Sequence, residues 1–405
     1  MKIAILWYWK EWKSTHNFLK KQWFKDITIL DKSLDKNYLE NLEKYDIIYK
    51  TPWISIYLPQ LQRVKDKIKT QADILFENFK WKLILISWSK WKSTTSTLIY
   101  EILKNAWKSV KLVWNIWNPI LSELDFDNLP EYIVFEISSY MLDSTKNIWS
   151  TYSILTNIYK VHTNWHKEHK NYVNAKLRLF ENNKFWIAYI WTKDIINKEN
   201  IIYFWEDTDY FFNEKFIYSP KYKFNINEVK LEWKHNYLNI CSILPICEKE
   251  NIAEKDIEQT LKQFQWLRHR QEFIAEIDGV KYYNDSIATI PESVLQVLER
   301  FEENLDTIIL WWEDNNFDYT KVINKLNKMK VQNIVLLPNS LERQKHLFKN
   351  KNIFEVDSLE KAVKIAKEKT RKWKVCVLSP GAPSLNMFKN FEQRWDLFRK
   401  YVLEK

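Results

Sequence analysis

Short apolar runs recur along the chain, and segments whose apolar residues are spaced as on one face of a helix lie between them. Residues 83–86 form such a run, and after a polar stretch residues 94–103 show the helical spacing. A continuous apolar run followed by an amphipathic segment is typical of a buried parallel strand and the helix that crosses back over the sheet. The pattern therefore predicts an α/β protein with parallel sheets.

The same reading gives the other elements. The predicted strands are 2–6, 27–30, 47–49, 83–86, 110–113, 133–135, 153–156, 281–283, 307–310, 333–337 and 375–378. The spacing predicts helices over 94–103 and 172–182, and a third helix that starts within 231–239. Pro245 is expected to interrupt the apolar face of this third helix.

A chain of 405 residues exceeds what one hydrophobic core usually supports. We predict three domains: a Rossmann-like nucleotide-binding unit (1–80), a central P-loop ATPase-type domain with a parallel or mixed sheet (81–266), and a Rossmann-like C-terminal domain (267–405). No apolar run approaches the roughly 20 residues of a membrane span. The three cysteines have neither metal-binding nor disulfide spacing, which indicates a reducing cytoplasm.

The net charge of +10 invites a nucleic-acid-binding interpretation. However, the lysines are spread along the chain rather than clustered, which favours a solvated surface that also attracts anionic substrates.

Residues 82–105 hold the strongest candidate site. Lys92, Ser93 and Thr94 lie between a predicted strand and a predicted helix. A phosphate-binding loop has its lysine, its magnesium-binding hydroxyl and its helix N-terminus at these places. Such a loop needs glycines, because its backbone folds tightly around phosphates. Trp88 and Trp91 stand where the glycines are expected.

The amino-acid composition offers an explanation. The chain has 2 Gly and 22 Trp, together 24, whereas ordinary usage predicts roughly 28 glycines in a chain of this length. The tryptophans gather at turn-like places such as 7–9, 114–117 and 311–312, which tryptophan has no reason to prefer. We hypothesise that most Trp letters stand for glycine, as when UGA encodes glycine but is read as tryptophan. The alternative is a protein that is truly rich in tryptophan.

Two other strand ends carry candidate chemistry. With glycine for tryptophan, residues 7–12 become G-x-G-x-x-G, a dinucleotide-binding pattern that is weak alone, and Asp31 follows the next strand, where an acidic residue would meet a ribose or base. Glu136 ends a strand beside the phosphate loop, where a carboxylate usually holds Mg²⁺. The alternative for Glu136 is a surface residue that caps a turn. Lys176 by itself reads as an ordinary solvated helix lysine.

Several blocks form a consistent series when glycine replaces tryptophan. They are G-S-K-G-K-S-T-T (88–95), G-N-I-G-N-P (114–119), E-x-S-S-x-x-L (136–142), a His-to-Ala-Lys block (162–176), L-E-G-K-H-N-Y-L-N (231–239), R-H-R-x-E (268–272), N-D-S-x-A-T (284–289) and the tail 379–398. In order and spacing this series resembles the muramyl ligase family of ATP-dependent amide-bond-forming enzymes across nearly the whole chain. Trp165 is an exception to the glycine hypothesis, because some members of the family have Trp at its place.

The resemblance implies an ATP-dependent ligase that adds D-glutamate to UDP-N-acetylmuramoyl-L-alanine through an acyl phosphate. It implies ATP and Mg²⁺ as cofactors, and a cytoplasmic monomer that acts in peptidoglycan precursor synthesis without membrane or nucleic-acid partners. Domain 1–80 would bind the UDP-sugar, and domain 267–405 would bind the amino acid and ATP. Closure of the last domain would bring the three ligands together.

The resemblance also implies roles for single residues. Catalytic roles fall to Lys92, Glu136, His162 and Lys176. ATP-binding roles fall to Ser89, Lys90, Trp91, Lys92, Ser93, Thr94, Asn236, Asn239, Arg270 and Asp285. Substrate-binding roles fall to Trp9, Ser14, Thr15, Asp31, Asn115, Ser138, Thr289, Ser384, Leu385 and Phe391. The implied metal ligands are Ser93, Glu136, His162 and a carbamylated Lys176.

Three positions depart from the family pattern. Val161 replaces an aspartate, and Ile287 and Asn315 replace lysines associated with binding of the glutamate. A family member that adds L-glutamate or another amino acid therefore stays open. A non-enzymatic nucleotide-binding module is a further alternative if the tryptophans are real, because indoles in the phosphate loop would block ATP. A nucleic-acid binder is the last alternative.

Overall fold

A computed structural model describes residues 1–6, 11–87, 92–113, 119–158, 163–196, 198–231, 234–264, 271–289, 291–311, 318–338, 344–382 and 387–404. The chain divides into two compact units, Met1–Gln265 and Trp266–Lys405. The first unit contains two main parallel sheets and the second unit contains one mixed sheet. The separation of 1–80 from 81–266 as independent domains stays a prediction.

The first sheet of the N-terminal unit has four parallel strands in the order β2-β1-β3-β4. Its elements are β1 (Ile3–Leu6), α1 (Glu11–Lys21), β2 (Ile27–Leu30), β3 (Ile47–Lys50), α2 (Pro59–Gln62), β4 (Ile68–Lys69) and α3 (Gln71–Asn78). One face of β1, with Ile3 and Ile5, packs against Leu19 of α1 and Ile74 of α3. The other face, with Ala4 and Leu6, packs in a separate core with Leu61 of α2. Both faces are covered, as a parallel sheet requires.

The central sheet has six parallel strands in the order β10-β9-β8-β5-β7-β6. Its strands are β5 (Lys82–Ser87), β6 (Val110–Val113), β7 (Tyr132–Glu136), β8 (Ser150–Leu155), β9 (Asn183–Tyr189) and β10 (Ile201–Phe204). The helices are α4 (Lys92–Asn105), α5 (Ile120–Glu123), α6 (Ser139–Ser144), α7 (Thr163–His166), α8 (His169–Leu177), α9 (Lys234–Lys249) and α10 (Glu254–Gln263). A small antiparallel sheet of β11 (Phe211–Phe212), β12 (Phe216–Tyr218) and β13 (Lys223–Asn225) precedes α9.

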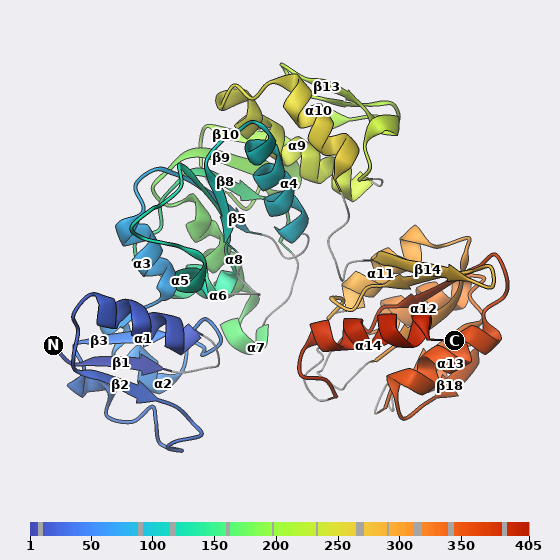
Figure 1. Ribbon diagram of the computed structural model, residues 1–405, viewed down its shortest axis with the longest axis horizontal. Helices are drawn as coiled ribbons and strands as arrows, with labels where there is room; N and C mark the ends of the chain where they lie inside the picture. Colours follow the sequence, from blue (N-terminus) through green and yellow to red (C-terminus); the bar gives the residue numbers. More distant parts are fainter. Residues whose placement is uncertain are drawn as a thin grey trace. The chain divides into compact units, whose positions relative to one another are not determined.

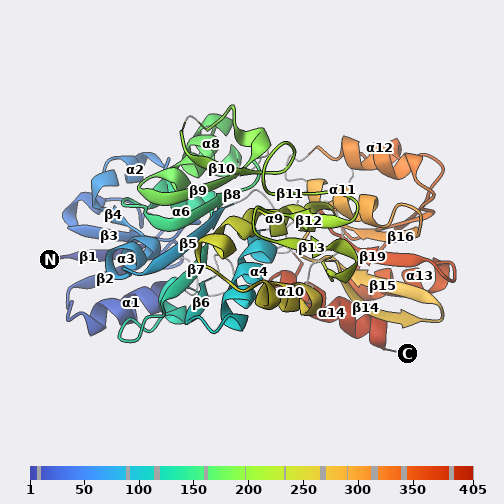
Figure 2. The ribbon, with the colours of Figure 1, turned by 90° about the horizontal axis from the view of Figure 1, so that it is seen from above.

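Helix α4, which follows the predicted phosphate loop, is held on two sides. It packs against strands β5, β6 and β7 and against helices α9 and α10, as Figures 1 and 2 show. Asn105 at its C-terminal end donates from Nδ2 to Thr260 Oγ1 of α10 at 2.8 Å. The opposite face of the sheet, with Leu83 and Leu85, packs against α3 and α6. The first turn of α4 is therefore fixed at the end of β5.

Two helix predictions were wrong in extent. The predicted helix 172–182 ends earlier, because α8 stops at Leu177 and a 3-10 turn leads into β9. Arg178 makes this turn, since its guanidinium donates to the carbonyl oxygens of Leu142 and Thr145. Pro245 lies inside α9 and is buried with its neighbours, so the predicted interruption of the apolar face is wrong.

A buried carboxylate joins three strands at the amino end of the central sheet. Glu250, just after α9, accepts hydrogen bonds from Lys82 Nζ at 2.6 Å and from the hydroxyls of Tyr132 and Tyr152 at 2.5 Å each. Burial alone would raise the pKa of Glu250, but these hydrogen bonds outweigh burial and lower the pKa. The network ties α9 to β5, β7 and β8, and it lies at the end of the strands opposite the expected phosphate site.

The second unit is built on the sheet β14-β15-β19-β16-β17-β18, in which only the pair β14–β15 is antiparallel. Its elements are β14 (Glu272–Ile277), β15 (Val280–Asn284), α11 (Pro291–Arg300), β16 (Leu305–Leu310), α12 (Thr320–Lys328), β17 (Asn333–Leu336), β18 (Asn352–Glu355), α13 (Leu359–Lys369), β19 (Val375–Leu378) and α14 (Phe391–Leu403). Helices α11 and α12 cover one face, and α13 and α14 cover the other. Strands β14 and β18 were not predicted.

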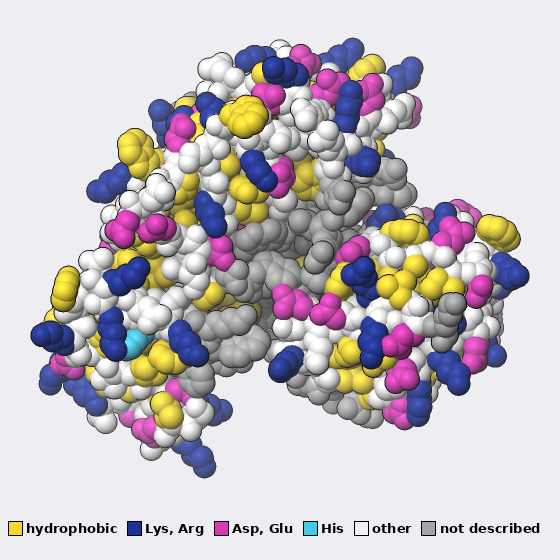
Figure 3. All heavy atoms as spheres, viewed as in Figure 1, with side chains coloured by type: hydrophobic (Ala, Val, Ile, Leu, Met, Phe, Trp, Pro, Cys, Tyr) yellow, Lys and Arg dark blue, Asp and Glu magenta, His cyan; other side chains and the backbone are white. Residues whose placement is uncertain are grey.

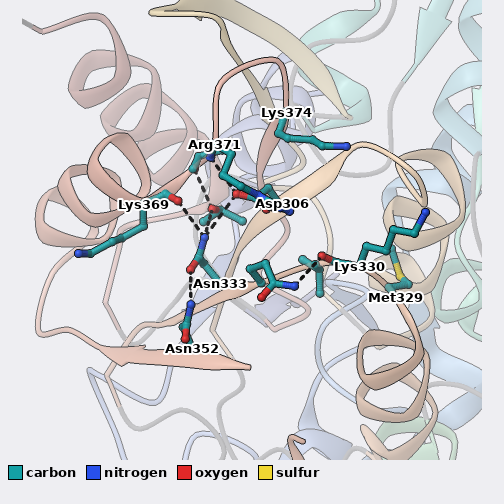
Figure 4. Close-up of polar contacts among 12 residues, drawn as sticks. Asp306, Met329, Lys330, Asn333, Asn352, Lys369, Arg371 and Lys374 are labelled. Atoms are coloured by element: carbon teal, nitrogen blue, oxygen red, sulfur yellow. Dashed lines mark hydrogen bonds and ion pairs between the residues drawn. The ribbon is translucent and has the colours of Figure 1, made fainter. Parts of the chain in front are cut away.

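A second polar network closes the amino end of this sheet (Figure 4). Asp306 of β16 is fully buried and accepts from Arg371 Nε at 2.8 Å and Nη2 at 2.6 Å. The backbone N–H of Arg371 donates to the other oxygen of Asp306 at 2.9 Å. Asn333 of β17 donates to Thr307 Oγ1 and to the Lys369 carbonyl oxygen. The network thus fixes the C-terminal end of α13 against β16 and β17.

Four tryptophans have the left-handed backbone that favours glycine. Their φ values are 65° for Trp23, 58° for Trp107, 93° for Trp205 and 66° for Trp373. Trp23 and Trp107 follow α1 and α4, and each is part of a Schellman motif. The N–H of the tryptophan donates to the carbonyl oxygen three residues before it, and the N–H of the next residue donates to the carbonyl oxygen five residues before that residue. Their side chains are 86% and 95% exposed.

In other tryptophans the indole ring packs in the interior or makes hydrogen bonds. Trp165 is buried, donates from Nε1 to the Pro52 carbonyl oxygen at 3.0 Å, and stacks on Tyr140 with ring centroids 4.7 Å apart. Trp149 donates from Nε1 to the Phe76 carbonyl oxygen at 2.9 Å. The structure therefore separates tryptophans that suit glycine positions from tryptophans that pack as aromatic residues.

The surface is mixed in charge. On the face shown in Figure 3, Lys and Arg side chains alternate with Asp and Glu and form no continuous basic area. Cys241, Cys247 and Cys376 are buried, free thiols. Over the described ranges, no helix has the length and apolar character needed to cross a bilayer.

Candidate active site

The carboxyl ends of β5 and β7 lie side by side, because these strands pair in parallel with Ile86 opposite Glu136. Glu136 ends β7 and is fully buried, so the alternative of a surface glutamate is wrong. Ser93, in the first turn of α4, donates from its hydroxyl to Glu136 Oε2 at 2.8 Å. Glu136 Oε1 is buried and has no hydrogen-bond partner among the described residues. Ser93 holds one oxygen of the carboxylate, and none of the described residues hydrogen-bonds to the other.

Lys176 reaches the same edge of the sheet from α8. Its side chain is only 1% exposed, so the interpretation as a solvated helix lysine is wrong. Its Nζ donates to Ser87 Oγ at 3.2 Å and lies 5.2 Å from the ring centroid of Tyr172. Ser87 is the last residue of β5, next to the pair Ile86–Glu136. The structure therefore brings the ammonium of Lys176 and the carboxylate of Glu136 to neighbouring strand ends.

Ser138 and the helix after it form part of the same edge. Ser138 is the N-cap of α6, and its Oγ accepts from the Met141 N–H at 3.2 Å. Its neighbour Ser139 lies 3.0 Å from His166 Nε2, and His166 Nδ1 lies 3.2 Å from Asp143 Oδ2. These contacts hold α7 against α6. The C-terminal end of α7, four residues after His162 in the sequence, is therefore fixed.

The predicted asparagines of α9 are buried, which is unusual for polar side chains. Asn236 and Asn239 are 1% and 0% exposed, and Asn239 Nδ2 donates to Asn236 Oδ1 at 3.3 Å. They lie in the first turns of α9, which packs against α4. Thr94, in the first turn of α4, is also buried. Binding of ATP by these asparagines stays a prediction.

Near the first sheet, Asp31 follows a strand and Ser14 and Thr15 lie on α1, and all three are engaged within the fold. Asp31, directly after β2, accepts from the N–H of Ser33 at 2.7 Å. Ser14 and Thr15 donate to the Glu11 carbonyl oxygen at 2.9 Å each. The Gln71 side-chain amide of α3 donates to both hydroxyls, at 2.9 and 2.8 Å. Ser14 and Thr15 therefore join α1 to α3, whatever their contact with a substrate.

In the second unit, Asp285 lies directly after β15 and is buried. Its Oδ1 accepts from the Gln271 N–H at 3.2 Å, and its Oδ2 accepts from Ser379 Oγ at 3.1 Å. Asp285 thus links the ends of β15 and β19. Thr289 lies four residues further along the same loop and is half-buried.

Several predicted residues lie outside the described ranges. They are Trp9, Ser89, Lys90, Trp91, Asn115, His162, Arg270, Ser384 and Leu385, together with the side chains of Lys92 and Phe391. The described residues contain no group of three His, Cys, Asp or Glu side chains that could hold a metal.

Sequence reasoning gave no role to two buried cations. Arg394 of α14 is fully buried and donates to Ser286 Oγ at 3.0 Å, to the Ser286 carbonyl oxygen at 2.6 Å and to the Ala382 carbonyl oxygen at 3.2 Å. Burial lowers the pKa of Arg394 to about 9. Lys50, at the end of β3, is 3% exposed. The sequence shows that Lys50 ends an apolar strand, but not that its ammonium turns inward to backbone carbonyls.

Comparison with known proteins gives a consistent picture. A model of the Mur ligase middle domain matches residues 88–240. A Clostridium tetani protein named UDP-N-acetylmuramoylalanine–D-glutamate ligase is 29% identical over 400 residues, which cover 91% of this chain and 85% of the relative. A Caldanaerobacter subterraneus protein of the same name is 28% identical over 386 residues, covering 90% and 85%.

Solved structures agree in fold. A pseudomurein peptide ligase type C from Methanothermus fervidus superposes with a TM-score of 0.65, at 15% identity, over 99% of both chains. A MurF ligase from Thermotoga maritima in complex with ADP gives a TM-score of 0.62, at 16% identity, over 91% of both chains. At such identities these likenesses establish the fold alone, and they confirm the predicted α/β fold.

Proposed function

Because the chain belongs to the Mur ligase family, we propose that it joins D-glutamate to UDP-N-acetylmuramoyl-L-alanine and converts ATP to ADP and phosphate. The observation that carries this proposal is the arrangement at the ends of β5 and β7, where Ser93 holds Glu136 and Lys176 bonds to Ser87. A hydroxyl at a helix start beside a buried carboxylate is what phosphoryl transfer from a nucleotide needs.

The residues present fit Mg²⁺. Ser93 and Glu136 offer oxygen ligands, which Mg²⁺ prefers, and Glu136 Oε1 is a buried acceptor without a partner among the described residues. His162, outside the described ranges, would complete the ligands. When bound, Mg²⁺ would neutralise charge on the phosphates.

The order of steps follows from the chemistry of a carboxylate. A carboxylate is a poor electrophile, so its oxygen first takes the γ-phosphoryl group of ATP and ADP leaves. The amino group of D-glutamate then attacks the acyl carbon, the C–N bond forms, and phosphate leaves with the carboxylate oxygen. Lys92 and the amides at the start of α4 would orient the phosphates, since positioning and charge neutralisation dominate such transfers.

The proposal includes carbamylation of Lys176. The amine would add to CO₂ and lose a proton, which replaces a cation by an anion at the edge that carries Glu136. The burial of Lys176 at the strand end beside that of Glu136 supports this role, because a buried charge is costly to desolvate.

The second unit is proposed to bind the amino acid and part of ATP. Asp285 would contact the nucleotide with Arg270, and Thr289, Ser384, Leu385 and Phe391 would line the amino-acid site. Ile287 and Asn315 replace lysines at this site, so L-glutamate is the second candidate for the incoming amino acid.

The phosphate loop requires glycine at positions 88 and 91. The left-handed backbone of Trp23, Trp107, Trp205 and Trp373 supports glycine for tryptophan elsewhere in the chain. We therefore retain the glycine reading for most positions and exclude Trp165, whose indole is packed and hydrogen-bonded. We further propose a cytoplasmic, monomeric enzyme of peptidoglycan precursor synthesis.

A coupled assay tests the function. Protein with glycine restored at the turn positions, including 88 and 91, is supplied with ATP, Mg²⁺ and UDP-N-acetylmuramoyl-L-alanine, and phosphate release is followed with D-glutamate, L-glutamate or lysine. We expect release with D-glutamate and its loss in Lys92→Ala. Release with L-glutamate alone would move the assignment to the second candidate. No release with any amino acid would contradict a ligase and favour a nucleotide-binding module.

A further inference from the structure

Lys50 is a buried cation that holds a turn from the inside. It ends β3, and its Nζ donates to the carbonyl oxygens of Thr51 at 2.8 Å and Ile54 at 2.7 Å. Trp165 takes a third carbonyl of the same turn, because its Nε1 donates to Pro52 O. The Lys50 ammonium also lies 5.6 Å from the Trp165 ring centroid. The turn 51–54 is therefore fixed by interior donors.

The turn lies where a parallel sheet of this topology binds ligands. In the order β2-β1-β3-β4, the chain reverses direction across the sheet between β1 and β3. Ligands of open α/β sheets bind outside the carboxyl ends of the strands at such a switch point. Residues 51–54 follow the carboxyl end of β3, which is one wall of that point.

Three acidic groups face Lys50 from different helices. Glu11 at the start of α1, Asp143 of α6 and Asp73 of α3 all attract its charge, whereas burial opposes the charge and lowers the pKa of Lys50 to about 7. Burial likewise raises the pKa of Glu11 to about 7, against the attraction of Lys50. Lys50 is therefore hydrogen-bonded to the turn 51–54, and acidic groups on three helices attract its charge.

We propose that Lys50 is a positioning residue for the UDP-sugar substrate: its hydrogen bonds to the carbonyls of Thr51 and Ile54 set the turn that forms one wall of the crevice between β1 and β3. This inference rests on the proposed function and adds a residue to it. Lys50 acts through the backbone, since its ammonium donates to the two carbonyl oxygens of the turn. Its loss should affect binding of the UDP-sugar and leave ATP and amino-acid binding intact.

The test is calorimetric titration with UDP-N-acetylmuramoyl-L-alanine, which needs no turnover. We expect Lys50→Met to raise the Kd about 10- to 100-fold, because small misplacements of binding groups have effects of this size. Lys50→Gln keeps an amide donor without the charge and should recover part of the affinity. Where turnover is measured, KM for the UDP-sugar should rise while KM for ATP stays constant.

Lys67→Met is the matched control. Lys67 also donates to two backbone carbonyls, of Glu43 at 2.6 Å and Tyr45 at 2.9 Å, but beside the amino end of β3. Its variant should bind the UDP-sugar normally. An unchanged Kd in Lys50→Met would overturn the proposal, as would equal losses in the Met and Gln variants, which would indicate direct charge attraction. If the unsubstituted protein binds the UDP-sugar but forms no product, the ligase assignment fails while the role of Lys50 is still measured.

Discussion

We expect Trp23 and Trp107 to lower the free energy of unfolding relative to glycine at the same positions. Both have φ near +60° directly after a helix, with the hydrogen bonds of a Schellman end. A bulky residue in this conformation destabilises the folded state by about 1–2 kcal/mol. Replacing it by glycine removes this strain, but the greater freedom of glycine in the unfolded chain offsets about 0.4–1 kcal/mol of the gain. Trp23→Gly and Trp107→Gly should therefore each stabilise the protein by about 0.5–1 kcal/mol.

The loss of buried apolar surface does not offset this expected stabilisation. The two indoles are 86% and 95% exposed, so their removal sacrifices little apolar contact. Trp165→Gly is the matched control of opposite sign. Its indole is buried, stacks on Tyr140 and donates to Pro52, so we expect a loss of about 3–5 kcal/mol.

Urea unfolding, followed by far-UV circular dichroism, measures these changes as shifts of the midpoint at constant m-value. The double variant Trp23→Gly/Trp107→Gly should show the sum of the two gains, because the positions end different helices and share no described contact. Midpoints that fall in both single variants would refute the reasoning and with it the glycine reading of exposed turn tryptophans. Peptide mass spectrometry of the natural protein gives an independent answer at each position.

Three further outcomes are expected. Glu136→Gln should lower kcat, measured by phosphate release, about 100-fold or more, because it removes charge from the site. The unfolding midpoint should change little, because the hydrogen bond to Ser93 is kept. An unchanged kcat would contradict the role of Glu136. Arg394→Met should raise KM for the amino acid more than KM for the UDP-sugar, since it frees the loops at Ser286 and Ala382; equal changes would indicate general loss of structure. The pKa of Glu250 is lowered by folding, so its stabilisation is present above the unfolded value near 4.5 and is lost as pH falls below it. Glu250→Gln should cost about 2–3 kcal/mol at pH 7 and flatten the acid side of a stability–pH curve, and an unchanged acid limb would disprove this.

The predicted strands were found where continuous apolar runs met clear turns. Strands β5 and β7 were located closely, because each is buried on both faces and follows a polar segment. Strand β14 was missed, since it is a partly exposed edge strand whose short apolar run is flanked by glutamates. Strand β18 is mostly exposed and carries too little apolar pattern to be recognised.

The candidate site divides in the same way. Glu136 could be placed from its position after a buried strand, because the ends of parallel strands meet at one edge. The burial of Lys176 could not be derived from its own helix, since the contact with Ser87 joins residues far apart in sequence. Lys50 and Arg394 were given no role, because most of their partners are backbone carbonyls, which the pattern of side chains does not show.

The buried carboxylates at the two ends of the six-stranded sheet in the first unit differ in how completely they are hydrogen-bonded. At one end Glu250 satisfies Lys82 and two phenols, while at the other Glu136 keeps an oxygen without a described partner. A deep mutational scan should therefore divide along the strands: changes at Lys82 or Glu250 would reduce cellular abundance, and changes at Glu136 would leave abundance intact but abolish growth support. Residues at the Glu136 end of such a sheet can therefore change during evolution while the network around Glu250 continues to stabilise the fold.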